Sequence, residues 1–328
     1  MEELTISSSL AQLERIGQGR CGTVWAVRCS ACDDHSHLAM KREDGSTGRS
    51  ISHEYRVHQK ITRASTQSSL SSFAIPRSVG FLAADDAAAW SVILPRFPPD
   101  YTACNAIVSE KILPVKESAR RLLVHKFRPD VDEEEIMRSQ SNEHCLLRPY
   151  LGRRRYHQTL SLRNYPLHMD QMEQLGLDPS GYAVAMADAL AFLHWVAHVD
   201  GNDVEFVLGR PRCRPDILSA TRTGGNISCS NTAVLGPHEV WILDFDLCRD
   251  MSLDEEGVDQ ANRAFWGNDP YFPRPGSSNL ADQRLWTMFQ DRYIESSAAA
   301  LHGEPDCIKR LPGLFIEQIK RARAVSSS

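Results

Sequence analysis

The sequence predicts an α+β fold of two lobes, with a β-rich N-terminal lobe over residues 1–97 and a mainly helical C-terminal lobe over residues 98–328. Three observations support this prediction. Short runs of β-branched and aromatic residues dominate the first part, Pro95, Pro98 and Pro99 then interrupt the chain, and apolar residues at helical spacing dominate the remainder. A length of 328 residues suits one large or two modest domains.

In the first lobe, the pattern predicts five strands and one helix. Residues 16–27 contain three glycines among β-formers, which predicts a strand, a turn and a second strand. Further strands are expected at 37–41, 78–82 and 90–94. Apolar residues at helical spacing predict a helix over 52–61, between the third strand and the fourth.

In the second lobe, helices are expected to predominate. A helix is expected within residues 110–127, where apolar residues alternate with basic ones. The clearest helix spans 181–198, because apolar residues recur there every three or four positions, at Met186, Leu190, Leu193 and Ala197. Strands are expected at 206–208 and 239–247, and the tail from Gln260 is expected to be helical again.

Composition excludes several classes of protein. Lys and Arg number 37 against 42 Asp and Glu, a net charge of −5, which excludes a polycation but permits a local basic face. Residues 1–16 lack an apolar segment, and no stretch has the roughly 18 apolar residues that a membrane helix needs. Nine cysteines, an odd number, favour a reducing compartment. We therefore expect a cytoplasmic protein with no membrane and no DNA partner.

Two motifs in the first lobe are typical of protein kinases. The first reads Gly-Gln-Gly-Arg-Cys-Gly-Thr-Val over residues 17–24, and its setting among β-formers fits the glycine-rich phosphate cover of kinases better than a dinucleotide fold. The second reads Leu-Ala-Met-Lys and ends at Lys41, with Glu54 following on the expected helix. Because a kinase lysine pairs with such a glutamate, we expect an ion pair between Lys41 and Glu54.

The second lobe carries further kinase-like motifs in the expected order. His-Val-Asp ends at Asp200, in the position of the catalytic base, and Asp-Phe-Asp over residues 244–246 resembles the metal-binding motif. Together these motifs predict a protein-kinase-like architecture. The departures from a kinase are acidic, since Glu205 replaces the metal-binding Asn, Asp246 replaces a glycine, and Asp203 is additional.

These departures predict a cluster of five carboxylates, namely Asp200, Asp203, Glu205, Asp244 and Asp246. Like charges at close range raise one another's pKa and require a cation. Mg²⁺ would satisfy them, although it usually takes only one or two protein carboxylates beside nucleotide phosphates. A guanidinium also fits, because its planar fork binds carboxylates through two hydrogen bonds. An arginine-bearing substrate is therefore a candidate.

One segment rich in Cys and His, residues 29–37, suggests a zinc site. Only two residues separate Cys32 from His35, which is far shorter than zinc-finger spacing, and no second Cys-x-x-Cys follows. We interpret the segment as the tip of a hairpin. No metal ligand and no cofactor are therefore assigned.

Basic residues gather locally despite the negative net charge. Arg153, Arg154 and Arg155 lie near tyrosines, and Arg210 and Arg212 begin a long polar loop. Cationic groups for phosphates, beside aromatic rings for unpaired bases, suit the end of an RNA. A charge run is also the ordinary composition of a solvated surface, so these residues leave RNA binding open.

Five stretches of the second lobe resemble the arginine-containing cyclodipeptide synthases, fungal proteins usually known as a domain of unknown function with a zinc-finger-like label. The stretches are CLLRPYLGRRR over 145–155, LRNYPL over 162–167, ALAFLHW over 189–195, DGNDVEFVLG over 200–209 and WILDFD over 241–246. The fourth is specific to that family. The resemblance implies that arginyl-tRNA and a second aminoacyl-tRNA are condensed, without ATP at this step, into a cyclo(Arg-Xaa) diketopiperazine.

The resemblance also implies roles for individual residues. The acidic motif would be catalytic, with Asp200 or Glu205 as general base, and comprises Asp200, Asp203 and Glu205. By comparison with kinases, substrate binding falls to Lys41, Glu54, Asp244 and Asp246. The expected contacts with tRNA are Arg153, Arg154 and Arg155.

Two other functions stay open. An ATP-dependent, kinase-like phosphotransferase is favoured by the glycine motif, Lys41, Asp200 and Asp244, whereas the acidic replacements weigh against it. A pseudoenzyme would use the same pocket only to bind a basic ligand or partner. The identity of the second amino acid does not follow from the sequence.

Overall fold

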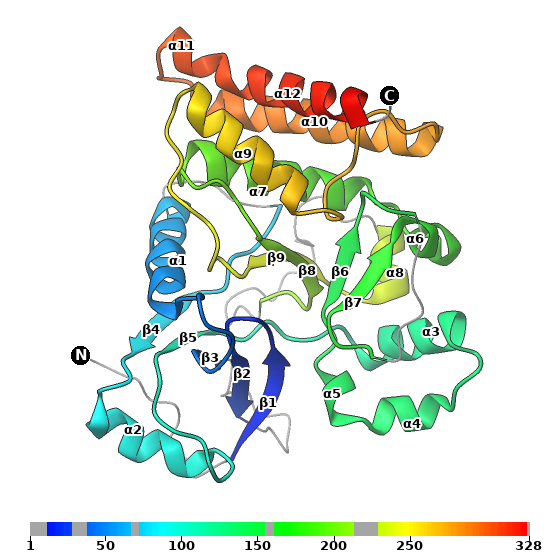
Figure 1. Ribbon diagram of the computed structural model, residues 1–328. Helices are drawn as coiled ribbons and strands as arrows, with labels where there is room; N and C mark the ends of the chain where they lie inside the picture. Colours follow the sequence, from blue (N-terminus) through cyan, green and yellow to red (C-terminus); the bar gives the residue numbers. More distant parts are fainter. Residues whose placement is uncertain (1–11, 28–37, 67–71, 155–160, 213–228, 327–328) are drawn as a thin grey trace, which may run out of the picture.

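The N-terminal lobe is built on a five-stranded antiparallel sheet in a computed structural model that describes residues 12–27, 38–66, 72–154, 161–212 and 229–326 (Figure 1). The strands lie in the order β1-β2-β3-β5-β4, and they are β1 (Leu13–Gln18), β2 (Thr23–Val27), β3 (Leu38–Arg42), β4 (Ser78–Leu82) and β5 (Ala106–Glu110). The expected strand–turn–strand, the third strand and the strand at 78–82 are confirmed.

Two helices cover the two faces of this sheet. Helix α1 (Ile51–Ser65) begins after Ser50, whose side chain caps it by accepting from the backbone N–H of His53. Its Ile51 packs on Ile107 of β5. The opposite face buries Trp25, Met40 and Val108 against α2 (Ala87–Ile93). Helix α1 thereby lies beside β3, which brings Glu54 within reach of Lys41.

Two sequence predictions for this lobe are wrong. Residues 90–94 are not a strand, because Asp86 caps a short helix over Ala87–Ile93 and places Trp90 and Ile93 against the sheet. The sheet also extends beyond residue 97, since β5 pairs with both β3 and β4. The lobe therefore ends after Glu110, and the prolines near Phe97 lie within it rather than at its border.

The C-terminal lobe is mainly helical and is organised around α7 (Ser180–Trp195), most of whose side chains are buried (Figure 1). Helix α10 (Leu280–Ala300) packs along α7. The other helices of the lobe are α3 (Glu117–Phe127), α4 (Glu133–Arg138), α5 (Gln140–Glu143), α6 (Met169–Leu175), α8 (Cys229–Leu235), α9 (Glu255–Gly267), α11 (Asp306–Lys309) and α12 (Leu311–Ser326). The predicted α+β fold class, with a sheet-rich and a mainly helical lobe, is confirmed. Within the described ranges, no helix is both long and apolar enough to cross a bilayer.

A second, smaller sheet positions the acidic residues. It has the order β7-β6-β8-β9, formed by β6 (Leu147–Tyr150), β7 (Tyr165–His168), β8 (Glu205–Gly209) and β9 (Glu239–Leu243). Glu205 is paired with Leu243 in the antiparallel register of β8 and β9, so Asp244 follows directly beside it. Strand β9 ends earlier than expected because Asp244 has a left-handed backbone, with φ of 66°.

Candidate functional site

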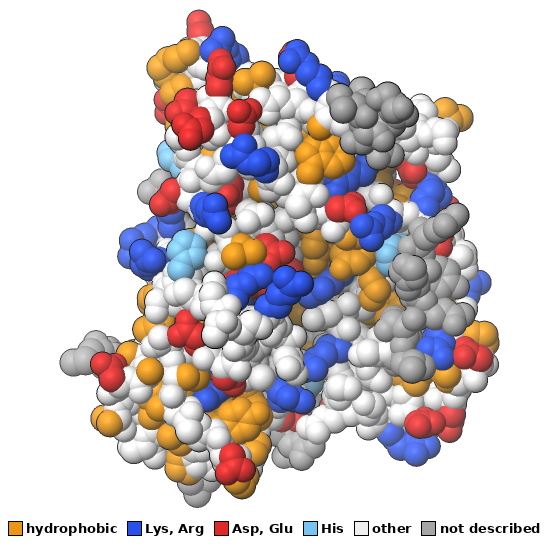
Figure 2. Space-filling view, viewed as in Figure 1, with side chains coloured by type: hydrophobic (Ala, Val, Ile, Leu, Met, Phe, Trp, Pro, Cys, Tyr) orange, Lys and Arg blue, Asp and Glu red, His pale blue; other side chains and the backbone are white. Residues whose placement is uncertain are grey.

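A cleft of about 200 Å³ lies between the two lobes. The N-terminal lobe lines it with the glycine hairpin, Lys41 and Glu54, and the linker between β5 and α3, residues 111–116, contributes Ile112. The C-terminal lobe lines it with residues from β6, β8 and the end of β9, namely Arg148, Glu205, Asp244 and Phe245. Figure 2 shows acidic and basic side chains close together near the centre of this face, between the lobes.

Lys41 lies at the centre of an ion-pair network that joins the lobes. Its Nζ donates to both carboxylate oxygens of Glu54, at 2.8 and 2.7 Å, and to Asp244 Oδ1 at 2.6 Å. The predicted pairing of Lys41 with Glu54 is therefore present. Burial raises the pKa of Glu54 to about 7, against the opposing effect of Lys41. Burial by itself would lower the pKa of Lys41, but Glu54 and Asp244 raise it above its ordinary value.

Glu205 forms a second ion pair with Arg148. The Nη2 of Arg148 donates to both oxygens of Glu205, at 2.6 Å each. Burial raises the pKa of the Glu205 carboxyl above its ordinary value, and Arg148 opposes that shift. The sequence analysis did not assign this role to Arg148, because the pair joins β6 to β8 across the small sheet.

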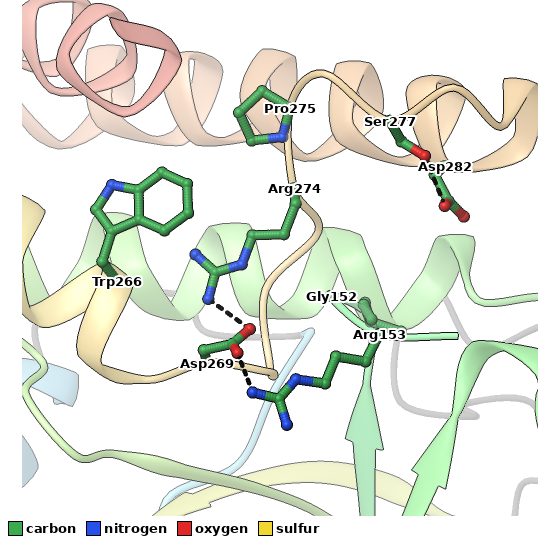
Figure 3. Close-up of a pocket in the computed structure, with 9 residues that line it drawn as sticks. Gly152, Arg153, Trp266, Asp269, Arg274, Pro275, Ser277 and Asp282 are labelled. Carbon is green, nitrogen blue, oxygen red and sulfur yellow. Dashed lines mark hydrogen bonds and ion pairs between the residues drawn. The ribbon is translucent and has the colours of Figure 1, made fainter. Parts of the chain in front are cut away.

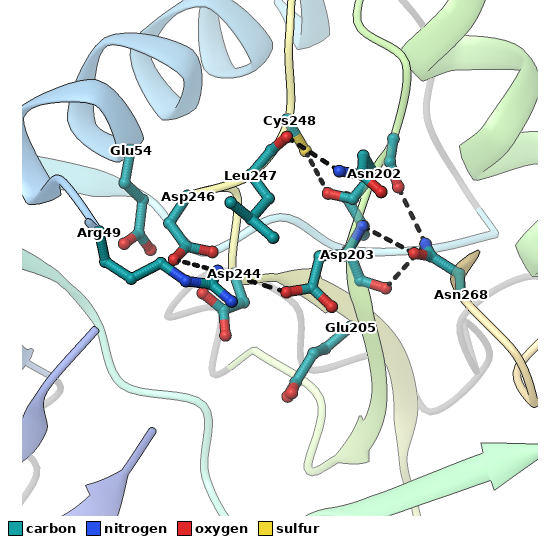
Figure 4. Close-up of polar contacts among 12 residues, drawn as sticks. Arg49, Glu54, Asn202, Asp203, Glu205, Asp244, Asp246, Leu247, Cys248 and Asn268 are labelled. Carbon is teal, nitrogen blue, oxygen red and sulfur yellow. Dashed lines mark hydrogen bonds and ion pairs between the residues drawn. The ribbon is translucent and has the colours of Figure 1, made fainter. Parts of the chain in front are cut away.

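Arg49 forms a third ion pair, at the rim of the cleft (Figure 4). Its Nη1 lies 2.6 Å from Asp246 Oδ2 and 3.4 Å from Asp203 Oδ2. Burial raises the pKa of Asp246, and nearby Asp244 adds to the effect. The sequence analysis did not single out Arg49, since nothing local links the residue before α1 with acids some 150 to 200 positions away.

The cleft and its rim carry more negative than positive charge. Figure 4 shows carboxylates from both lobes facing one region, and the five are Glu54, Asp203, Glu205, Asp244 and Asp246. The cations paired with them are Lys41, Arg49 and Arg148. Among these described groups, five carboxylates face three cations, so the carboxylates outnumber the cations by two. A bound cation would therefore be stabilised here.

Asp200 is placed differently from the other acids. Its carboxylate accepts from the backbone N–H groups of Asn202 and Arg249, at 3.1 and 2.9 Å, and from the Gln260 side chain at 2.8 Å. Asp200 is buried and is not among the residues that line the cleft. It braces the loop that follows α7 against the segment after β9. Of the two candidate bases, Glu205 is the one that lines the cleft.

The glycine hairpin is held down by the segment that follows β3. Asp44 accepts from the backbone N–H and the hydroxyl of Thr23, at 2.7 and 2.6 Å. The N–H groups of Gly45 and Ser46 donate to the carbonyls of Cys21 and Arg20. A Cβ on Gly22 would lie 1.9 Å from the Arg42 carbonyl, so only glycine fits there. A carboxylate bonded to the hairpin makes it a poor cradle for phosphates.

The arginines expected to contact tRNA are engaged within the protein. Arg153 forms an ion pair with Asp269, and both line a pocket of about 390 Å³ (Figure 3). Arg154 donates through Nε and Nη2 to Asp282 and also pairs with Glu173. Arg155 lies outside the described residues. The positive charges of Arg153 and Arg154 are therefore balanced by neighbouring acids.

The expected hairpin tip at residues 29–37 also lies outside the described residues. Within the described part of the chain, no group of three or more His, Cys, Asp or Glu side chains could hold a metal ion.

Comparison with known proteins gives one family match. A model of the family described as DUF3669, zinc finger protein, matches residues 240–305, about a fifth of the chain. No curated protein matches the chain. The recognised resemblance to arginine-containing cyclodipeptide synthases is therefore wrong, because the matching family is described as a zinc finger protein and nothing supports a synthase family.

The matched segment does not itself hold the ligands of a zinc finger. It contains one cysteine, Cys248, and one histidine, His302, whereas a structural zinc site takes four such ligands. Cys248 is buried, and its thiol donates to the carbonyl of Asn202 at 3.3 Å. What the segment does contain is β9, Asp244 and Asp246, which form one side of the acidic cleft.

Proposed function

We propose that the cleft is the active site of an aminoacyltransferase that consumes arginyl-tRNA and a second aminoacyl-tRNA. Its product would be a cyclo(Arg-Xaa) diketopiperazine, formed without ATP as part of secondary metabolism. The observation that carries the proposal is the excess of two carboxylates over cations in the cleft. A guanidinium supplies the missing charge, and its planar fork suits carboxylate pairs.

The accessible carboxylates indicate where an arginyl side chain would bind. The side chains of Asp203, Glu205 and Asp244 are 53%, 24% and 31% exposed. Asp246 and Glu54 are buried and already hold Arg49 and Lys41. Asp203 and Asp244 both have positive φ angles, 62° and 66°, a strained backbone that is common at functional sites. The guanidinium would therefore first meet Asp203 and Asp244, which leaves Glu205 free to act on the α-amine.

Glu205 is the proposed general base. Its raised pKa makes it a stronger proton acceptor than an ordinary glutamate. In the proposed step, Glu205 takes a proton from an α-amine as its nitrogen attacks the ester carbon of the other aminoacyl-tRNA. The bond between that carbon and the ribose oxygen breaks, and the ribose oxygen receives the proton. A second aminolysis closes the ring. Arg148 lines the cleft beside Glu205 and is a cationic donor for the developing oxyanion.

A basic groove on the linker side supports a tRNA partner. A groove of about 260 Å³ is lined by Arg77, Lys111, Arg210 and Arg212, and among the described residues that line it Glu110 alone is acidic. Arg77 is 67% exposed, so its charge is available to a phosphate. The basic residues that line this groove therefore outnumber the acidic one, whereas Arg153 and Arg154 are each paired with acids.

Replacing Arg77 and Arg210 together by Ala is expected to weaken tRNA binding and lower its salt dependence. Each lost phosphate contact reduces the slope of log K against log salt by roughly 0.7 to 0.9, so the double variant should lose up to about 1.8. The matched control replaces Arg153 and Arg154, whose charges are internally paired. Fluorescence anisotropy with labelled tRNA at several salt concentrations measures both. An unchanged slope in the first variant would place the tRNA elsewhere.

The alternative is an ATP-dependent, kinase-like phosphotransferase. The network of Lys41, Glu54 and Asp244 favours it, because kinases hold nucleotide phosphates and magnesium with such a set. The arrangement of Glu205 and of the hairpin favours the aminoacyltransferase. Glu205 stands where a kinase has a neutral metal ligand, and Asp44 puts a negative charge beside the glycine hairpin.

Preformed aminoacyl-tRNAs separate the two functions. The protein is incubated without ATP with arginyl-tRNA and a mixture of other aminoacyl-tRNAs, and cyclic dipeptides containing arginine are sought by mass spectrometry. Formation of such a product, with its loss after ribonuclease treatment, is expected. A product that resists ribonuclease contradicts the use of tRNA. Phosphate transfer from ATP without tRNA supports the kinase alternative, and inactivity in both assays with tight arginine binding supports a pseudoenzyme.

A further inference from the structure

Arg49 occupies the acidic rim as a ligand would. It lies in the segment between β3 and α1, yet its guanidinium reaches two acids of the C-terminal lobe, Asp246 and Asp203 (Figure 4). The Arg49 side chain is only 13% exposed. The protein therefore already holds one guanidinium at the place where the excess negative charge lies.

The two acids form a built site rather than a chance surface pair. The side chain of Asp246 is 2% exposed, and its Oδ1 is buried without a hydrogen-bond partner among the described residues. The backbone of Asp203 is held in place, because its N–H donates to Asn268 Oδ1 at 2.7 Å. An unpaired oxygen on a buried carboxylate is costly, and a better-placed donor would remove that cost.

Arg49 fits this site incompletely. It uses one nitrogen, Nη1, for both contacts and leaves Asp246 Oδ1 unpaired. Arg154 shows the fuller geometry elsewhere in the molecule, because its Nε and Nη2 both donate to Asp282. A guanidinium that is free to orient itself could donate to both oxygens of Asp246 in the same way. Such a ligand would compete well with Arg49.

Displacing Arg49 would affect the cleft entrance. Residues 43–50 tie down the glycine hairpin through Asp44, Gly45 and Ser46, and Arg49 links the same segment to the C-terminal lobe. The segment is therefore held at both ends. When Arg49 leaves its carboxylates, one of these attachments is lost, and the hairpin above the cleft becomes easier to move.

We infer that Asp203 and Asp246 form a guanidinium-selective binding site that Arg49 fills as a displaceable occupant, so that a guanidinium-bearing ligand competes with Arg49 and frees residues 43–50. Only the naming of arginine as the natural competitor rests on the proposed function. The site takes a guanidinium rather than an ammonium because the planar fork can satisfy both oxygens of the buried carboxylate.

The test uses Arg49→Met, which keeps the apolar stem and removes the guanidinium. Thermal unfolding is followed with methylguanidinium or methylammonium chloride at equal ionic strength. The variant should unfold roughly 4–7 °C below the wild type, and methylguanidinium at about ten times its dissociation constant should restore about 2 °C. Methylammonium should restore less than half as much. Lys60→Met is the matched control, since Lys60 also joins the lobes but pairs with the exposed Asp250.

Several outcomes contradict the inference. A guanidinium site at Asp246 is excluded if the added cation raises the unfolding temperature of Arg49→Met and Lys60→Met equally. It is also excluded if methylguanidinium and methylammonium raise the unfolding temperature equally, or if the effect survives when Asp246→Asn is added to Arg49→Met. If Arg49→Met does not fold, hydrogen exchange of the wild-type protein tests the inference instead. With argininamide, the amides of Gly45 and Ser46 should exchange at least threefold faster, and unchanged exchange overturns the inference. Neither measurement depends on enzymatic turnover, so failure of the proposed reaction is detected separately.

Discussion

Glu205→Gln is expected to reduce formation of the cyclic dipeptide by roughly 10² to 10⁴-fold, the usual contribution of a general base. Glutamine keeps the shape of the side chain and still accepts a hydrogen bond from Arg148, but it cannot take up a proton. The variant should therefore fold normally, and single-turnover rates with preformed aminoacyl-tRNAs measure the loss. Near-normal turnover would mean that Glu205 is not the base.

The pH dependence of the rate provides a second test of Glu205 as the general base. Glu205 must be ionised to act as a base, and burial raises its pKa above the ordinary value of 4.5. The rate should therefore fall as the pH is lowered through a value above 4.5, and this acidic limb should be absent from Glu205→Gln. A limb that persists in the variant belongs to another group.

Asp200→Asn is the matched control for this prediction. Asp200 accepts two backbone N–H groups and the Gln260 side chain away from the cleft, so the substitution should lower stability more than turnover. Turnover per folded molecule is therefore expected to stay within a few-fold of the wild type. If Asp200→Asn instead loses all turnover at unchanged stability, the base is Asp200.

Lys41→Met is expected to cost about 3–5 kcal/mol of unfolding free energy, because it leaves the buried carboxylate of Glu54 without its cation. Glu54 is 7% exposed, and both of its carboxylate oxygens accept hydrogen bonds from Lys41. Adding Glu54→Gln should restore much of the loss, since the double variant buries no unpaired charge. Urea unfolding of the four proteins forms the cycle that measures the pairing.

The pH dependence and a control variant sharpen this test. In Lys41→Met, the pKa of Glu54 should rise further above 4.5, so the contribution of Glu54 to stability is present at low pH and is lost as the pH rises through the folded-state pKa. The variant should therefore unfold more easily at about pH 8 than at about pH 5. Lys60→Met, which breaks a pair with the exposed Asp250, should cost less than about 1 kcal/mol. Similar losses of unfolding free energy in Lys41→Met and Lys60→Met would contradict the expectation that a buried ion pair costs more to break than an exposed one.

The acidic cleft was predicted in part from residue identity and order. Glu205 and Asp244 were expected together because both stand at metal-binding positions of the kinase-like motifs, and antiparallel pairing of β8 and β9 does place them side by side. The burial of Asp200 behind the cleft was not predictable, because it depends on backbone groups some 50 positions away along the chain. Arg148 and Arg49 were missed for the same reason.

By itself, the sequence determined the local features of this protein. The glycines of the hairpin, the strand that ends near Lys41 and the helix that carries Glu54 follow from residue types at fixed short spacings, which periodicity and backbone preference control. The tertiary structure decided which charges meet. Ion pairs such as that of Arg49 with Asp246 join residues from different lobes, and their formation depends on how the lobes pack and bury each group, which no short stretch of sequence encodes.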